Sequence, residues 1–174
     1  MTSTKTTVVR TDEVSQEEYF TIQKFIYREA RLADESQYAE WESLWDAEGF
    51  YWIPVGDGNY DPDVEVSIVY DNRARIASRV RQLMSGKRFA QVPASVMRRT
   101  ISNLEVARGG ESEYQVEANF MLMEMPMQSS KEIRLWGGRV QYLLRASAEG
   151  FKIGRKKVIL VNGAGPIPNL PFLI

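Results

Sequence analysis

The chain contains no cysteine and no histidine among its 174 residues. Without cysteine, the protein can have no disulfide, no thiolate nucleophile and no metal cluster held by thiolates. Histidine is the usual general base near neutral pH and a common ligand of zinc, copper and non-haem iron. Its absence excludes a Ser-His-Asp triad, a two-histidine-one-carboxylate iron site and an iron–sulfur cluster with histidine ligands.

The chain also lacks an excess of positive or negative charge. It has 22 Lys and Arg residues and 23 Asp and Glu residues, which gives a net charge of −1. Such a chain has no long-range field that would attract nucleic acid or an anionic bilayer. The sequence has no run of about 18 consecutive apolar residues. Residues 1–12 also lack the apolar segment of a signal peptide. We therefore expect a cytoplasmic protein that binds neither nucleic acid nor a membrane.

The length fits one domain, and a domain of this size buries roughly 70% of the surface that its unfolded chain exposes. The sequence shows no internal repeat, no low-complexity tract and no linker that would divide it. We predict a flexible N-terminal tail over residues 1–14 and a single α+β domain over residues 15–174. That domain includes a proline-rich, apolar C-terminal tail.

The clearest helical signal lies near the N-terminus. Ser15 and Glu18 have the spacing of a capping box, and apolar residues then recur every three or four positions. These apolar residues are Tyr19, Ile22, Ile26, Ala30 and Ala33. The spacing predicts a helix of about five turns with one apolar face.

Two shorter helices and a strand are predicted next. A second helix is expected from Tyr38 to Asp46, and Gly49 is expected to end helical structure. Residues 50–55 have the aromatic and β-branched composition of a strand, and Pro54 places it at a sheet edge or near its own end. Either residue of the pair Asp71-Asn72 can cap a third helix.

From residue 100 onward the pattern changes to strands that are longer than usual. The predicted strands are Thr100–Val106, Tyr114–Met125, Ile133–Ala146 and Phe151–Val161. Such strands must twist and bend, and Gly137, Gly138 and Gly154 stand where bulges or sharp curvature would form. Helices followed by hairpin-linked strands indicate an α+β fold. We predict N-terminal helices packed on a strongly curved, mostly antiparallel sheet, which gives a cone with an internal cavity.

Several local phrases then point to a known family. They are Phe25–Asp34 (FIYREARLAD), Trp41–Trp45 (WESLW) leading into Tyr51–Pro54 (YWIP), Ile68–Arg73 (IVYDNR) and Arg98–Asn103 (RRTISN). In this order, from about Glu17 onward, the sequence resembles the β (small) subunits of Rieske-type aromatic-ring-hydroxylating dioxygenases. The resemblance implies the cone fold of the nuclear transport factor 2 superfamily.

The resemblance also implies a division of labour between subunits. In this family the α (large) subunit holds a Rieske 2Fe-2S cluster and a mononuclear non-haem iron, and it oxidises an aromatic ring to a cis-dihydrodiol. Electrons come from NAD(P)H through a reductase, and three α subunits typically assemble with three β subunits around a β trimer. The present chain would then be a structural and assembly subunit in aromatic compound catabolism, with no cofactor, metal or catalytic residue of its own.

The methionine-rich segment from Phe120 to Met127 is apolar on both faces of its predicted strand. Either both faces lie in the core, or a partner subunit buries the outward face, because thioether side chains adapt to irregular contacts. Under the second alternative, Met121, Met123 and Met125 are candidate interface residues.

The C-terminal tail contains three prolines and closes with Phe172, Leu173 and Ile174. Proline excludes a helix or a central strand, so these three residues must dock as an irregular segment, either on their own domain or on a neighbouring chain. Arg98 and Arg99 similarly could pair with carboxylates of this chain or with acidic residues of the α subunit. We include all five among the candidate interface residues.

The remaining basic clusters have simpler interpretations. The arginines of the third helix fit a solvated face, and they are Arg73, Arg75, Arg79 and Arg81. The run Arg155-Lys156-Lys157 is interpreted as a solvent-facing or edge-blocking feature of the last strand.

Two other classes of function stay open. The chain could be a stand-alone cavity isomerase or dehydratase, similar to ketosteroid isomerase, in which a tyrosine donates a proton and an aspartate accepts one. The donors would come from Tyr19, Tyr27, Tyr38 and Tyr51, and the acceptor would be Asp34 or Asp46. It could also be a ligand-binding or scaffolding module without an oxygenase partner.

Overall fold

The computed structural model describes residues 14–87, 93–127, 132–168 and 170–174. Nearly all of the predicted N-terminal tail, residues 1–13, lies outside these ranges, and Val14 packs against the core. The elements described are α1 (Gln16–Asp34), α2 (Tyr38–Ser43), β1 (Trp45–Pro54), β2 (Ser67–Asn72), α3 (Arg73–Met84), β3 (Val96–Arg108), β4 (Glu113–Met125), β5 (Arg134–Ser147) and β6 (Gly150–Leu160). No helix within these ranges is long and apolar enough to cross a membrane.

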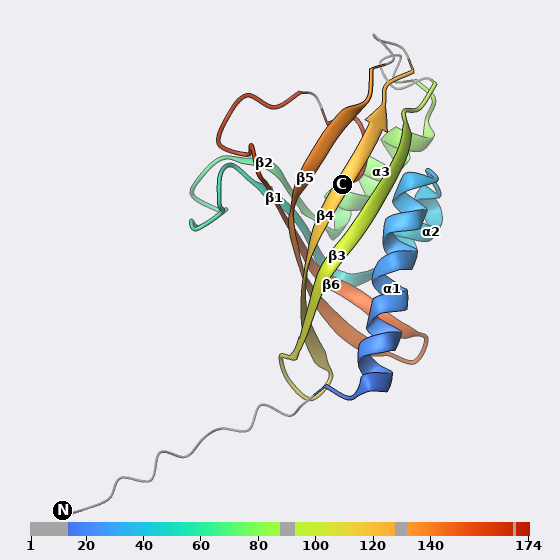
Figure 1. The fold of residues 1–174 in the computed structure, drawn as a ribbon, viewed down its shortest axis with the longest axis vertical. Coiled ribbons are helices and arrows are strands. Elements are labelled where there is room, and N and C mark those ends of the chain that lie inside the picture. Colours follow the sequence, from blue (N-terminus) through green and yellow to red (C-terminus); the bar gives the residue numbers. More distant parts are fainter. Residues whose placement is uncertain (1–13, 88–92, 128–131, 169) are drawn as a thin grey trace, which may run out of the picture.

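The strands form one sheet in the order β2-β1-β6-β5-β4-β3. Neighbouring strands are antiparallel, except that β1 and β6 are parallel. The sheet curls, the helices gather on one side of it, and α1 runs beside β3 (Figure 1). The predicted α+β class and the strongly curved, mostly antiparallel sheet are therefore confirmed.

The second helix is shorter than predicted. It ends at Ser43 and not at Asp46, because Trp45 already pairs with Ile153 of β6. Gly49 does not end a helix but lies inside β1, where a Cβ would stand 2.9 Å from the ring of Trp45. The glycine is thus required for close packing within a strand, and the prediction of its role was wrong.

The long strands lie where the sequence predicts them, with their ends shifted by a few residues. The largest shift is at β3, which begins at Val96 and not at Thr100. The predicted bulge at Gly154 is confirmed, because the register of β5 and β6 shifts after Leu143 and leaves Gly154 without a partner across the pair.

The N-terminus of α1 has the predicted capping box and is tied to the sheet through the same glutamate. The Ser15 hydroxyl accepts from the N–H of Glu18 (3.2 Å), and the Glu18 carboxylate accepts from the N–H of Ser15 (2.9 Å). The carboxylate also accepts from the Tyr114 hydroxyl of β4 (2.6 Å) and from the Arg108 guanidinium of β3. These interactions lower the pKa of Glu18 to about 2, with the Tyr114 hydrogen bond as the largest cause.

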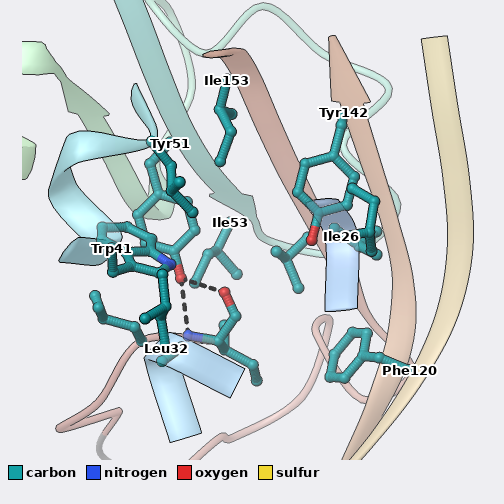
Figure 2. Packing of buried hydrophobic residues seen from close by; sticks show 14 of the residues in the cluster. Ile26, Leu32, Trp41, Tyr51, Ile53, Phe120, Tyr142 and Ile153 are labelled. Atoms are coloured by element: carbon teal, nitrogen blue, oxygen red, sulfur yellow. Dashed lines mark hydrogen bonds between the residues drawn. The ribbon is translucent and has the colours of Figure 1, made fainter. Parts of the chain in front are cut away.

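The core fills the space between the helices and the concave side of the sheet. Trp41 packs edge to face on Trp45 and Tyr51 at its centre, Trp45 and Tyr51 are tilted against each other, and the ring centroids lie 5.2 to 6.1 Å apart. Figure 2 shows Ile26 of α1 and Tyr142 of β5 facing this aromatic group from the other side. Side chains of the described residues therefore fill much of the interior in which the sequence predicts a cavity.

Two adjacent glycines of β5 differ sharply in the room around them. A Cβ on Gly138 would lie 2.0 Å from the carbonyl oxygen of Ile159, whereas a Cβ on Gly137 would meet nothing nearer than 3.6 Å. The β5–β6 register is continuous at Gly138, which pairs with Leu160. Gly138 therefore permits a close approach of two strands, and of the two predicted alternatives, a bulge or sharp curvature, the bulge is excluded here.

Replacing Gly138 with alanine should destabilise the protein, because the new methyl group must displace the backbone of β6. Overpacking of this kind costs about 1–3 kcal/mol, which urea denaturation followed by circular dichroism would measure. Gly137→Ala is the matched control and should change stability by less than about 1 kcal/mol, because Gly→Ala in a strand with free space is mild. Equal losses in the two variants would contradict the close-approach explanation.

Lowering the pH should remove the contribution of Glu18 to stability. Because its folded pKa lies below the ordinary value of 4.5, its stabilising effect is present above pH 4.5 and is lost as the pH falls toward about 2. Urea midpoints measured from pH 6 to pH 3 should fall less steeply for Glu18→Gln than for the unchanged chain. Tyr114→Phe, which removes the largest cause of the shift, should give an intermediate slope.

Candidate functional site

A buried ion pair lies in the interior, where α1 faces the sheet. The Lys156 ammonium group of β6 stands 2.7 Å from the Glu29 carboxylate of α1, and the two side chains are only 2% and 1% exposed. Glu29 also accepts from the indole N–H of Trp41 (2.6 Å) and from the hydroxyl of Tyr142 (3.0 Å). The carboxylate is therefore held by three different elements and is fully enclosed.

The electrostatics of this cluster keep Glu29 ionised. Burial alone would raise its pKa, but the charges of Lys156 and Arg99 and the hydrogen bonds from Lys156 and Trp41 outweigh burial and lower it. Burial raises the pKa of Tyr51 and of Tyr142, so both phenols stay protonated hydrogen-bond donors. The interior thus holds a carboxylate without a proton to give and phenols that do not release theirs near neutral pH.

A second cluster in the interior holds the C-terminal segment. The Arg99 guanidinium bonds to the Asp34 carboxylate (2.7 Å) and to the carbonyl oxygen of Leu173 (2.8 Å). The Tyr51 hydroxyl donates to the main-chain oxygen of Ile174 (2.9 Å) and accepts from its N–H (3.2 Å), as the dashed lines of Figure 2 show. The ion pair and the tail therefore share one enclosed space.

This arrangement does not bring together the tyrosine and aspartate of a cavity isomerase. Tyr19 donates to the carbonyl of Leu104, and Tyr27 is 47% exposed. Tyr38 is half-buried, and the hydroxyl of Tyr51 is engaged by the tail. The two candidate acceptors are also occupied, Asp34 by Arg99 (2.7 Å) and Asp46 by Arg145 (3.2 Å). Among the described residues, no group of three or more Asp or Glu side chains could hold a metal ion.

Lys156 is the main interior residue that the sequence interpretation missed. It was interpreted as part of a solvent-facing or edge-blocking run, yet it is fully buried and β6 lies inside the sheet between β1 and β5. Lys156 is two residues from Val158 and four from Leu160, so all three side chains lie on the inward face of β6. This spacing was the signal in the sequence that Lys156 is buried. The bulge at Gly154 interrupts this pattern, so that Ile153, an odd-numbered residue, also points inward. The inward-facing residues of β6 therefore do not follow one period-2 pattern along the whole strand.

The candidate interface residues divide between the inside and the outside of the cone. Met121 and Met123 are 57% and 44% exposed on the outer face of β4, whereas Met125 is half-buried. The alternative in which this face lies in the core is therefore wrong for Met121 and Met123. Arg98 is exposed beside Met123 and donates to the carbonyl of Met97 (2.7 Å).

The other candidates are buried by their own chain. The Arg99 side chain is only 3% exposed, in its ion pair with Asp34. Phe172, Leu173 and Ile174 are 6%, 0% and 2% exposed, and Phe172 packs edge to face on Trp136. Within this chain, these four side chains leave almost no surface that a partner could contact, so the tail docks on its own domain.

The outer face of β3, β4 and β5 carries a group of exposed apolar side chains, which we call the outer patch. It consists of Val96, Met121, Met123 and Leu135. Met123 lies directly between Arg98 of β3 and Leu135 of β5 in the sheet register, and Leu135 is 68% exposed. Adjacent exposed apolar side chains on three neighbouring strands are typical of a surface that another protein covers.

Comparison with solved structures places the fold in a known class. The β subunit of benzoate 1,2-dioxygenase from Burkholderia mallei superposes with a TM-score of 0.72 at 23% identity, and 93% of this chain and 99% of that chain are covered. An NTF2-like protein with a cystatin-like fold from Novosphingobium aromaticivorans gives a TM-score of 0.57 at 16% identity, with 84% of each chain covered. The fold is thus the NTF2-like cone fold that the sequence predicted.

Comparison at the level of sequence identifies the family. A family model described as "Ring hydroxylating beta subunit" matches residues 28–164. The small subunit of 2-halobenzoate 1,2-dioxygenase from Burkholderia cepacia is 33% identical over 149 residues, which cover 83% of this chain and 88% of that subunit. The chain belongs to the family of ring-hydroxylating dioxygenase β subunits, and the resemblance found in its sequence is confirmed.

Removing either charge of the interior ion pair should destabilise the fold. Glu29→Gln or Lys156→Met should each lower the free energy of unfolding by about 3–5 kcal/mol, because each leaves an unpaired partner in the interior. The double variant should lose clearly less than the sum of the two, and urea denaturation would measure this coupling.

The exposed pair Arg31–Glu35 at the C-terminal end of α1, 52% and 37% exposed, is the matched control. Arg31→Met and Glu35→Gln should change stability by no more than about 0.5 kcal/mol each. Strictly additive losses for Glu29→Gln and Lys156→Met would show that the two side chains do not act as a pair.

Proposed function

We propose that this chain is the non-catalytic assembly subunit of an aromatic-ring-hydroxylating dioxygenase in aromatic compound catabolism. In this proposal an α subunit holds the Rieske 2Fe-2S cluster and the mononuclear iron and carries out cis-dihydroxylation, with electrons from NAD(P)H delivered by a reductase. The observation that carries the proposal is the outer patch on a chain whose own interior is filled. Membership of the β-subunit family supports the same role.

The interior argues for this division of labour on chemical grounds. The chain has no histidine or cysteine that could ligate either iron centre. The buried carboxylate of Glu29 is committed to Lys156, Trp41 and Tyr142. A group that is already fully hydrogen-bonded and ionised is a poor proton shuttle, so the same geometry disfavours the cavity isomerase.

The outer patch has the composition expected of a protein-binding surface. Burying a methionine or leucine side chain completely stabilises an association by roughly 1.5–3 kcal/mol, and Met121, Met123 and Leu135 are each more than 40% exposed. Arg98 at the edge of the patch adds a cation that an acidic residue of the partner could meet. The partner surface we propose is therefore apolar at its centre and acidic at its rim.

The finer assembly is also part of the proposal. We propose that three copies of this chain associate into a trimer that joins three α subunits, in the cytoplasm. Met121, Met123 and Arg98 are the residues we assign to subunit contacts, and Met125 lies at the border of the contact. The buried candidates Arg99, Phe172, Leu173 and Ile174 would support the interface only by holding the shape of the subunit.

A charge placed in the outer patch should abolish assembly without unfolding the chain. Met123→Glu should weaken association with the cognate α subunit at least tenfold, because a carboxylate would enter an apolar contact and its pairing with Arg98 across the strands would withdraw that cation from the partner. The measurement is the mass and the iron content of the co-expressed complex, by size exclusion with light scattering.

Val64→Glu provides the control, because Val64 is 80% exposed in the loop between β1 and β2, away from the patch. It should leave the complex intact. If Met123→Glu still forms an iron-containing complex of unchanged mass, the outer patch is not the contact. If the isolated chain ignores α yet isomerises an enolisable ketone, the assembly role itself fails.

A further inference from the structure

The C-terminal tail binds in the interior through contacts like those that hold a ligand. We call its residues Phe172, Leu173 and Ile174 the plug. Leu173 and Ile174 are almost completely enclosed, and Phe172 packs on Trp136. A cavity of about 10 Å³ lies beside Ile174, among the described residues. The segment thus fills a space bounded by side chains from α1, β3, β4, β5 and β6.

The plug is held by polar contacts to its main chain and by apolar contacts to its side chains. Arg99 donates to the carbonyl of Leu173, and Tyr51 both donates to and accepts from the main chain of Ile174. Phe120, which lines the cavity beside Ile174, supplies part of the apolar wall. This combination of a few fixed polar groups within apolar walls is the usual chemistry of a small-ligand site.

The polar groups of the site do not depend on the plug for their orientation. Arg99 is fixed by Asp34, whose carboxylate also accepts from the main-chain N–H of Arg99 (2.8 Å). Tyr51 lies within the aromatic group formed with Trp41 and Trp45. Both donors therefore keep their positions if the plug leaves, which is the condition for a preorganised site.

We propose that the interior of the cone is a binding site for a short apolar peptide, which the plug occupies in its own chain. The ligand class is defined by two main-chain oxygens that accept from Arg99 and Tyr51, with bulky apolar side chains beside them. This proposal is independent of the outer patch, because the two lie on opposite faces of the sheet.

The test uses a chain shortened to end at Pro171, with the peptide acetyl-Pro-Phe-Leu-Ile added as a separate molecule. At about 100 times its Kd, the peptide should raise the thermal midpoint of the shortened chain by roughly 5 to 10 °C. The full chain should show no shift, because its site is filled. Adding Tyr51→Phe to the shortened chain should weaken the peptide at least fivefold, since one donor is lost.

Several results would overturn the proposal. A shortened chain that stays folded but does not respond to the peptide would show that the interior recognises no ligand. An equal shift in the full chain, or with acetyl-Pro-Glu-Lys-Ser, would place the binding elsewhere. If the shortened chain is unfolded, recovery of native circular dichroism on adding the peptide supports the site, and failure to recover refutes it.

Discussion

The contact between Glu29 and Lys156 determines how the helical layer lies against the sheet. A carboxylate and an ammonium group withdrawn from water are tolerable only if they meet each other and satisfy their remaining hydrogen-bonding capacity. Here the carboxylate of α1 reaches Trp41 of α2, Tyr142 of β5 and Lys156 of β6 at the same time. A rotation or slide of α1 by one residue would leave a buried charge unpaired. The ion pair therefore fixes both the rotation and the axial position of α1 against the sheet.

The two faces of the sheet differ in how far their side chains are engaged. Side chains on the inner face have partners within the chain, whereas apolar side chains on the outer face are exposed. Inside, the ion pair, the aromatic group and the docked tail use nearly all available donors and acceptors. Outside, Met123 of β4 lies opposite Leu135 of β5, and Met121, Met123 and Leu135 are 57%, 44% and 68% exposed. Exposed apolar side chains therefore gather on the outer face, whereas the inner face is covered by the core.

Local signals predicted those parts of the structure that local physics determines. The capping box at Ser15, the helical apolar face of α1 and the bulge at Gly154 each arise from residues a few positions apart. The parallel pairing of β1 with β6 could not be predicted, because no periodicity records which distant strand is a neighbour. The role of Lys156 was missed for the same reason, since its burial depends on a carboxylate contributed by a helix far away in the sequence.

The parallel pairing of β1 and β6 also governs the order in which the chain can fold. Trp45 pairs with Ile153, so β1 can pair with β6 only after the strands β2 to β5 have been made. Contacts between residues so far apart raise the contact order and slow folding. Until β6 arrives, one edge of β1 is unpaired and open to wrong partners.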